Sequence, residues 1–166
     1  MSWTAVTFHT PEYSIYAESW RSSIEALGGK PVVIEMPTTG NYNRNTGLKP
    51  SAILRAWSLV EEGWFLYTDI DTQVLKAPCP PHEAWDVGIT DNLFTHHVNR
   101  IASAYILFRK TPGALRFIEH WEALCKRTRN KDHPLLTRTI RDHQSGRRTV
   151  IRKVTAAWKP NGLRPT

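Results

Sequence analysis

The sequence predicts an α/β fold in which a mixed, mostly parallel β-sheet is flanked by helices. Apolar strand-like and amphipathic helix-like segments alternate as strand, helix, strand, helix, strand between residues 4 and 68, which is typical of a parallel sheet. The chain has 166 residues, of which 40% are hydrophobic and 22% are charged, as in ordinary globular proteins. We therefore expect a single domain over residues 1–166.

The first three elements form a strand, helix, strand unit. Residues 4–8 predict a strand, and a helix is expected from Ser14, as its N-cap, to about Leu27, before a Gly-Gly pair. Residues 31–36 predict the second strand. The apolar face of the helix is expected to consist of Ile15, Trp20, Ile24 and Leu27.

A polar, turn-rich segment over residues 38–48 predicts an exposed loop that can fold over a ligand. Pro50 is typical of the first turn of a helix, and Gly63 is expected to close that helix. Residues 64–68, WFLYT, then predict a buried strand. The helix is expected to bury Ile53, Leu54, Trp57 and Val60.

The second half of the chain continues the alternation. Residues 85–90 are apolar and lead to Asp91, and residues 101–108 predict a longer strand. Thr111 and Pro112 begin a helix with an apolar face that reaches Cys125. A short helix is expected from Asp132, as its cap, to about Asp142. The segment RRTVIRKVT predicts a basic strand at a sheet edge.

Two carboxylates, Asp69 and Asp71, follow the buried WFLYT strand directly. In an extended segment, residues i and i+2 point to the same side, so both acids can bind one cation. Acids at the carboxyl edge of a sheet lie where open α/β folds bind ligands. Such a cation can offset the charge of a nucleoside diphosphate, and Lys49, at a helix start, can add a positive charge there.

Charge is distributed unevenly along the chain, which has a net charge of +7. From residue 126 onward, 12 Lys and Arg stand against two Asp, a net charge of +10. The preceding part holds 10 basic and 13 acidic residues, a net charge of −3. This basic C-terminal segment indicates either a polyanionic partner, such as nucleic acid or a diphosphate ligand, or a solvated surface.

Composition also argues against several classes of protein. Cys79 and Cys125 lack the spacing of a zinc site or a disulfide framework. The N-terminus has no secretory pattern, and no apolar run approaches the roughly 20 residues of a membrane helix. We expect a soluble, cytoplasmic protein without a membrane partner, located in the host cytoplasm if phage-encoded. Most of the seven Trp residues are expected in the core.

The segment WFLYTDIDTQVLKAP resembles the Asp-X-Asp motif of GT-A-fold, nucleotide-sugar-dependent glycosyltransferases, especially the glycogenin-like and sugar-binding-region families. The similarity extends to LKPSAILRAW before the motif and to WDVGITD, ASAYILFRKTPGALRFIEHW and DHPLLTRTI after it. It covers roughly residues 4–142. The resemblance implies a Rossmann-like GT-A fold and transfer of a sugar from a nucleoside diphosphate sugar.

The same resemblance implies roles for particular residues. Asp69 and Asp71 would bind Mn²⁺ or Mg²⁺ bridging the diphosphate, with Thr68 and Lys49 also at the donor site. The first loop would approach the nucleoside through His9, Thr10 and Tyr13. Catalytic groups near the reacting sugar or acceptor would come from Asp91, Asp132 and His133.

The chain departs from the family pattern at two places. It has Ala102-Ser103-Ala104 where these families often have Asn-Ser-Gly, which removes a polar contact to the donor sugar. It has Asp132-His133 where they often have Asp-Gln. The second difference leaves the catalytic group, and therefore retention or inversion at the anomeric carbon, open.

Two other functions are weighed against sugar transfer. A haloacid dehalogenase-type phosphatase also has an Asp-X-Asp motif at the end of a strand. In this chain, however, Gln73 occupies the position where that class normally has Thr or Val, and two strand-helix units precede the motif, which is usually near the N-terminus. A nucleic-acid-binding module would explain the basic segment but not the acids. A sugar transferase whose acceptor is a modified base in DNA, of a kind known from phages, would explain both the acids and the basic segment.

Overall fold

The computed structural model describes residues 3–61, 63–91, 101–128, 132–146, 149–154 and 158–160. Within these ranges, the described side chains exclude those of residues 91, 101, 102, 132, 133 and 158–160. The elements, in chain order, are β1 (Trp3–His9), the 3-10 helix η1 (Pro11–Tyr16), α1 (Ala17–Glu25), β2 (Gly29–Glu35), α2 (Tyr42–Thr46), α3 (Lys49–Trp57), β3 (Trp64–Thr68), β4 (Thr72–Val74), β5 (Val87–Asp91), β6 (Ile101–Arg109), α4 (Pro112–Thr128), α5 (Asp132–Gly146), β7 (Ile151–Lys153) and β8 (Trp158–Pro160).

Six of the described strands form a sheet in the order β2-β1-β3-β6-β5-β7. β1 pairs in parallel with β2 and β3, and β5 pairs in parallel with β7. β6 is antiparallel to both of its neighbours, β3 and β5. Five of these six strands therefore run in one direction, which confirms the predicted mixed, mostly parallel sheet. The basic strand β7 lies at an edge of the sheet, as predicted.

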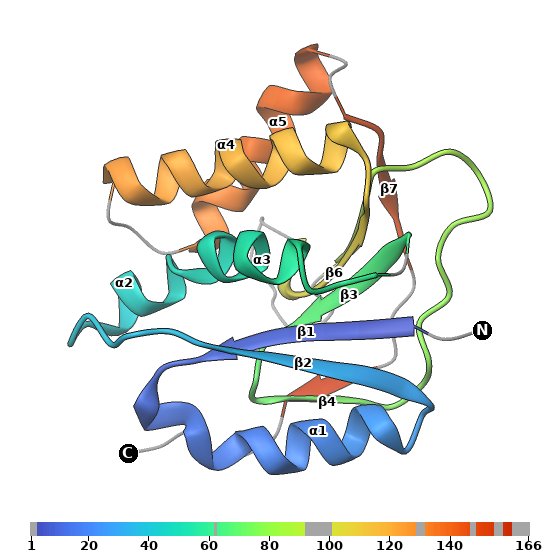
Figure 1. Cartoon of the computed structure of the whole chain (residues 1–166). Coiled ribbons are helices and arrows are strands. Elements are labelled where there is room, and N and C mark those ends of the chain that lie inside the picture. The colour runs from blue at the N-terminus through green and yellow to red at the C-terminus, as the bar shows by residue number, and fades with distance from the viewer. Residues whose placement is uncertain are drawn as a thin grey trace.

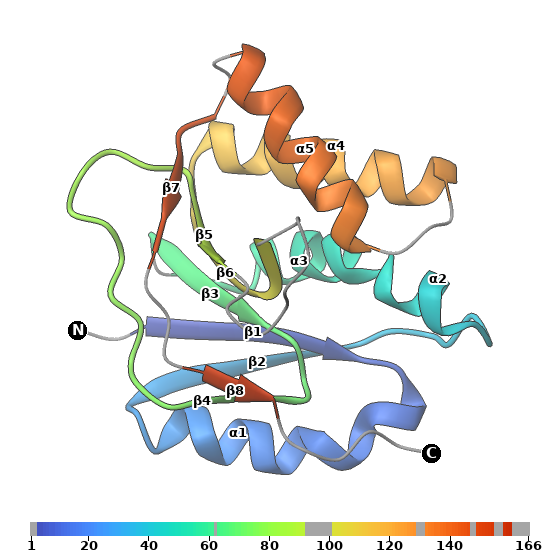
Figure 2. The ribbon, with the colours of Figure 1, turned by 180° about the vertical axis from the view of Figure 1, so that it is seen from behind.

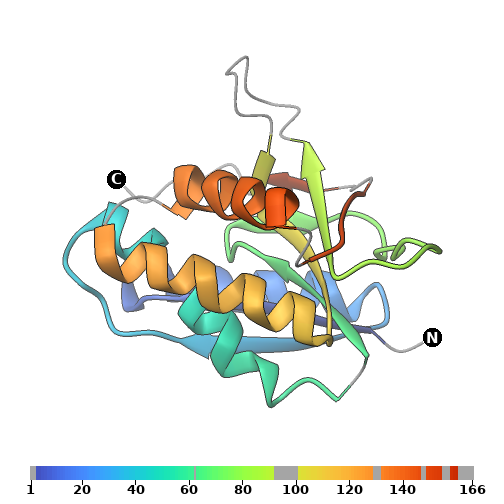
Figure 3. The same cartoon turned by 90° about the horizontal axis from the view of Figure 1, so that it is seen from above.

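Helices cover both faces of the sheet (Figure 1). α1 packs on one face, while α3, α4 and α5 lie on the other, where α4 and α5 lie side by side when viewed from above (Figure 3). β3 contributes to both cores: Phe65 and Tyr67 face the core under α3 and α4, and Leu66 faces the core over α1. The alternation confirms that WFLYT is buried on both faces.

The first helix differs from the sequence prediction. The chain forms a 3-10 helix, η1, and the α-helix begins only at Ala17. Ser14 does not cap a helix, because its hydroxyl donates to the backbone oxygen of Pro11 within η1. Ile15 is 71% exposed, so its assignment to the buried face was wrong, whereas Trp20 and Ile24 are fully buried. Ile15 lies in the 3-10 helix, which has three residues per turn, whereas Trp20 and Ile24 lie in the α-helix, which has 3.6. The side chain of Ile15 therefore does not line up with theirs on the buried face.

The predicted loop over residues 38–48 contains the short helix α2 and is held by its own polar side chains. Asn41 caps α2 by accepting from the backbone N–H of Arg44 at 3.2 Å. Asn45 accepts from both the backbone N–H and the hydroxyl of Thr39, at 2.8 and 2.7 Å. This segment is therefore folded rather than irregular.

A second, two-stranded sheet was not predicted. β4 follows the Asp pair and pairs antiparallel with β8 near the C-terminus, on the α1 side of the molecule (Figure 2). Two boundaries also differ from the prediction: α3 ends at Trp57, well before Gly63, and α5 runs to Gly146 rather than to about Asp142. No helix within the described ranges is long and apolar enough to span a membrane.

Four of the Trp residues, Trp3, Trp20, Trp85 and Trp121, are buried, as the composition predicted. Cys79 is exposed and Cys125 is buried. Neither takes part in a disulfide.

Candidate functional site

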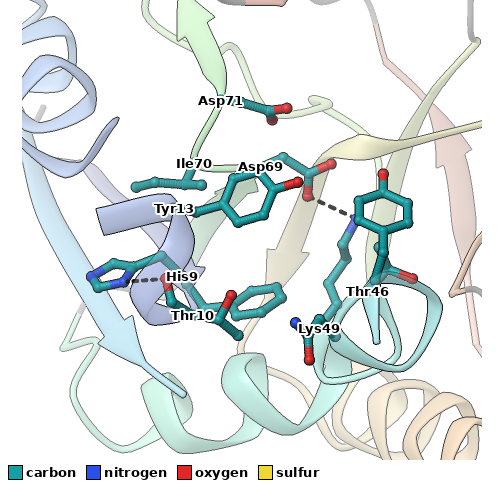
Figure 4. A pocket seen from close by; sticks show the side chains of 11 residues that line it. His9, Thr10, Tyr13, Thr46, Lys49, Asp69, Ile70 and Asp71 are labelled. Atoms are coloured by element: carbon teal, nitrogen blue, oxygen red, sulfur yellow. Dashed lines mark hydrogen bonds and ion pairs between the residues drawn. The ribbon is translucent and has the colours of Figure 1, made fainter. Parts of the chain in front are cut away.

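A pocket lies at the edge of the sheet where β1 and β3 end (Figure 4). Because these two strands are parallel, their carboxyl ends meet at one edge, and Lys49, the first residue of α3, lines the pocket there. The pocket encloses about 90 Å³, enough for several water-sized groups, so a larger ligand would extend out of it. Its lining consists of Phe8, His9, Thr10, Tyr13, Tyr42, Asn45, Thr46, Lys49, Asp69, Ile70 and Asp71.

The first wall is formed by the end of β1 and by η1. His9, Thr10 and Tyr13 all line it, so the structure brings together the three residues predicted for the first loop. The backbone N–H of Tyr13 donates to the oxygen of Thr10 at 2.9 Å, which starts η1. Nδ1 of His9 lies 3.2 Å from the same oxygen, so the Nδ1–H tautomer can donate to it.

The opposite wall is formed by α2 and the start of α3, and it adds residues that the sequence analysis did not single out. Tyr42, Asn45 and Thr46 line the pocket from α2. Tyr42 is 59% exposed, which is high for an aromatic side chain in a folded segment. The sequence predicted that the loop over residues 38–48 can fold over a ligand. Its polar composition does not indicate which of its side chains face the pocket, so these three residues were not predicted.

The Asp-X-Asp segment closes the pocket between these walls. Asp69, Ile70 and Asp71 all line it, and Ile70, which is 5% exposed, also packs in the α1-side core. The backbone oxygen of Asp69 accepts from the N–H of Thr72 at 3.1 Å, which forms a turn into β4. Figure 4 shows both acids beside the pocket, with the carboxylate of Asp69 directed at Lys49.

Thr68 does not line the pocket, although the sequence analysis placed it at the donor site. Its side chain is fully buried, and its hydroxyl accepts a 2.8 Å hydrogen bond from the indole N–H of Trp20. The described contacts of Thr68 therefore fix the end of β3 next to Asp69.

Lys49 joins the walls of the pocket. Its ammonium group lies 2.7 Å from Oδ1 of Asp69, and its side chain is 4% exposed. It also donates at 3.2 Å to both the backbone oxygen and the hydroxyl of Ser103, near the start of β6. The hydroxyl of Tyr67 donates to the same Oδ1 at 2.9 Å, and Lys49 Nζ lies 5.6 Å from the centre of the Tyr67 ring.

Ser103 is the polar residue that remains in Ala102-Ser103-Ala104, the segment that departs from the family pattern. Its two contacts with Lys49 bring β6 into the site, and the backbone oxygen of Ala104 accepts from the N–H of Asp69 at 3.4 Å. From the sequence, this segment indicated only a loss of contacts to the donor sugar, and its contact with Lys49 was not predicted.

A carboxylate outside the pocket ties its two outer segments together. Glu12, in η1, accepts from the hydroxyl of Thr38 at 2.5 Å, which links η1 to the segment that carries α2. The hydrogen bond from Thr38 is the main cause of the lowered pKa of Glu12. The ionised carboxylate is therefore the form that this link favours.

The donor atoms of the pocket suit a hard divalent cation. Mn²⁺ and Mg²⁺ prefer oxygen ligands, and Mg²⁺ in proteins commonly takes one or two carboxylates and completes its shell with water and phosphate. Asp69 and Asp71 supply such carboxylates on one pocket. In the part of the chain that the structure describes, no group of three or more His, Cys, Asp or Glu residues could hold a metal ion.

The three predicted catalytic residues fall on side chains outside the described part of the structure. Asp91 is the last residue of β5, which runs parallel to β3, so its backbone lies at the same sheet edge as the pocket. Asp132 and His133 are the first two residues of α5. Their predicted roles therefore stay predictions.

No protein-family model matches the chain, and no curated protein matches its sequence. Solved structures do match. A glycosyltransferase involved in the glycosylation of the major capsid of the virus PBCV-1 superposes with a TM-score of 0.69 at 16% identity, covering 92% of this chain and 81% of that one. The glycosyltransferase GlyE of Streptococcus pneumoniae TIGR4 gives a TM-score of 0.63 at 12% identity.

The chain has a GT-A-type glycosyltransferase fold. It covers 45% of the length of GlyE, and 91% of this chain is matched there. The inositol-1-phosphate CTP transferase of T. maritima also shares the fold, with a TM-score of 0.54 at 9% identity over 95% of this chain and 69% of that one. These likenesses confirm the fold that the resemblance implied, and at such identities they concern the fold alone.

Proposed function

We propose that this protein is a metal-dependent glycosyltransferase that moves a sugar from a nucleoside diphosphate sugar to an acceptor. The observation that carries this proposal is that Asp69 and Asp71 line one pocket with the first-loop residues at the carboxyl edge of the sheet. The GT-A-type fold supports it, since two structural neighbours are described as glycosyltransferases and a third as a CTP transferase.

Each pocket wall has a role in the proposal. Asp69 and Asp71 hold Mn²⁺ or Mg²⁺ against the diphosphate, and the bound ion offsets the charge that develops on the departing nucleoside diphosphate. His9, Thr10 and Tyr13 bind the nucleoside, with the Tyr13 ring available for stacking on a base. Lys49 adds positive charge close to the diphosphate.

The reacting centre requires a group that activates the acceptor hydroxyl or stabilises the sugar as the donor bond breaks. We propose Asp91, Asp132 and His133 for this work. Asp91 is favoured because its backbone lies at the same sheet edge as Asp69. Either stereochemical outcome at the anomeric carbon fits these candidates.

We propose a modified base in DNA as the acceptor, on the strength of the basic C-terminal segment. Exposed cations of α4, α5 and β7 form its described part, although several have acidic partners: Lys126 lies 2.8 Å from Glu122 and Arg152 lies 3.0 Å from Glu83. DNA phosphates can exchange with such surface partners. DNA that neither binds at low salt nor accepts sugar, while small acceptors are used, would exclude this acceptor. Within the described part of this segment, the exposed cations are Lys126, Arg127, Arg138, Arg141, Arg152 and Lys153.

A thermal-shift screen of nucleoside diphosphates and their sugars, each with and without Mn²⁺, tests the proposed function. A ligand that binds the native state raises its melting temperature, so the correct base is expected to stabilise the protein only with metal. That donor is then incubated with acceptors, and release of the nucleoside diphosphate is measured. Stabilisation by DNA alone would favour a binding module, and orthophosphate release from simple esters would favour a phosphatase.

A further inference from the structure

The hydrogen-bonding capacity of Lys49 is directed at the protein. An ammonium group has three N–H donors and no acceptor. Lys49 Nζ lies within hydrogen-bonding distance of Oδ1 of Asp69 and of two oxygens of Ser103, the backbone carbonyl and the hydroxyl. Three protein oxygens of the described residues therefore surround the ammonium group, and at 4% exposure the side chain of Lys49 is almost entirely covered.

We propose that Lys49 is the resident counter-cation of Asp69 and thereby lowers the affinity of the nucleotide-free pocket for a divalent cation. A metal ion held by Asp69 would lie within a few ångströms of the fixed ammonium charge. The inference rests on the proposed function and assigns Lys49 a role in metal binding. It implies that metal binds together with the diphosphate, whose negative charge offsets both cations.

The position of Lys49 makes this repulsion hard to relieve. The side chain is anchored on β6 by Ser103 and lies over the ring of Tyr67, which also donates to Asp69. If the ammonium moved away from Asp69 within this buried setting, it would lose its counter-ion at a large cost. The positive charge therefore stays beside the carboxylate when a metal approaches.

A different role for Lys49 makes a different prediction. If Lys49 served chiefly as a direct hydrogen-bond donor to phosphate, its replacement would weaken nucleotide binding and leave the metal affinity of the nucleotide-free protein unchanged. If it served only to hold α3 and β6 together, its replacement would lower stability without tightening metal binding. Metal affinity without nucleotide therefore separates these roles.

The experiment is a Mn²⁺ titration of the full, nucleotide-free chain, with free Mn²⁺ measured by electron paramagnetic resonance. Lys49→Gln removes the charge but keeps amide donors, whereas Lys49→Arg keeps the charge. Even in a water-like dielectric, a unit charge about 5 Å from a divalent cation changes an equilibrium constant roughly tenfold. We expect Lys49→Gln to bind Mn²⁺ at least about tenfold more tightly than the wild type, and Lys49→Arg to stay within about threefold.

An unchanged or weaker Mn²⁺ affinity in Lys49→Gln, with native circular dichroism, would overturn the proposal. The wild-type chain alone also tests the proposal. Its Mn²⁺ dissociation constant without nucleotide is expected to be about 1 mM, as for weak carboxylate sites. A dissociation constant below about 10 µM would contradict the proposal. If no nucleoside diphosphate in the thermal-shift screen binds with metal, the proposed function itself fails. If one does, and Lys49→Gln leaves metal affinity unchanged, only the role of Lys49 fails.

Discussion

The indole N–H of Trp20 donates a 2.8 Å hydrogen bond to the hydroxyl of Thr68, and both side chains are fully buried. Trp20 lies in α1, and Thr68 is the last residue of β3, directly before the Asp-X-Asp segment. The bond therefore joins the helix on one face of the sheet to the point where the chain leaves the sheet for the pocket.

Trp20→Phe is expected to destabilise the fold by about 1–3 kcal/mol, because it removes the indole donor and shrinks a packed side chain. Urea unfolding monitored by circular dichroism measures this loss. Thr68→Val removes the other partner at nearly constant volume, and the double variant closes a thermodynamic cycle. A coupling energy near zero would show that the hydrogen bond does not stabilise the native state.

The two acids of the motif are expected to differ in their contribution to stability. Asp69→Asn removes the charge that neutralises buried Lys49, so we expect a loss of about 2 kcal/mol or more. Asp71 is half-buried at the pocket mouth, and Asp71→Asn is expected to change stability by less than about 0.5 kcal/mol. Equal unfolding midpoints in urea for the two variants would show that the ion pair between Lys49 and Asp69 does not stabilise the fold.

Glu122 is expected to give stability a measurable pH dependence. Burial acts to raise its pKa, but hydrogen bonds from Lys126 and from Ser51, in α3, outweigh this effect and lower the pKa. A lowered native-state pKa stabilises the fold above the unfolded-state value of about 4.3 and loses that effect as pH falls through the native-state pKa.

Glu122→Gln is therefore expected to be less stable than the wild type at about pH 7, and the difference is expected to shrink towards about pH 3. Urea unfolding at several pH values measures it. Glu119→Gln changes an exposed carboxyl on the same helix and serves as the matched control. A stability difference for Glu122→Gln that stays constant across this range would be inconsistent with the lowered pKa.

Tyr13 and Ile15 offer a matched test of the nucleoside wall, since both belong to η1 but only Tyr13 is among the pocket-lining residues. Tyr13→Ala is expected to weaken binding of the preferred nucleoside diphosphate by roughly tenfold, through loss of a stacking surface. Ile15, at 71% exposure, is expected to tolerate Ala without a change in affinity. Calorimetric titration compares the two, and equal affinities would remove Tyr13 from the nucleoside wall.

Much of the sheet could be predicted because its strands carry local signals. Apolar runs bounded by Gly, Pro or Asp indicated β1, β3 and β6, and the acids after β3 indicated the pocket edge. The pairing of β4 with β8 could not be predicted, since Thr72 and Pro160 pair across a large separation in sequence and neither segment has a distinctive pattern. Pairing between such distant short strands is a tertiary effect.

The site was predicted in part for the same reason. Asp69 and Asp71 were found because they come just after a buried strand, whereas His9, Thr10 and Tyr13 were implied by the resemblance to a known family. The contact between Lys49 and Ser103 depends on how the start of α3 meets the start of β6, which no local pattern encodes. Tyr42 was missed because α2 forms through side-chain hydrogen bonds of Asn41 and Asn45 within a segment that reads as a loop.

The central claim is that Asp69 and Asp71 hold a divalent cation against the diphosphate of a nucleotide. Its most direct test is calorimetric titration of the nucleoside diphosphate chosen by the thermal-shift screen, with Mn²⁺ and with excess chelator. Wild type and Asp71→Asn are compared, and Asp142→Asn, on the surface of α5, is the matched control. We predict that chelator or Asp71→Asn weakens binding at least about tenfold, whereas Asp142→Asn does not. Equal affinity with and without metal in the wild type would contradict the account.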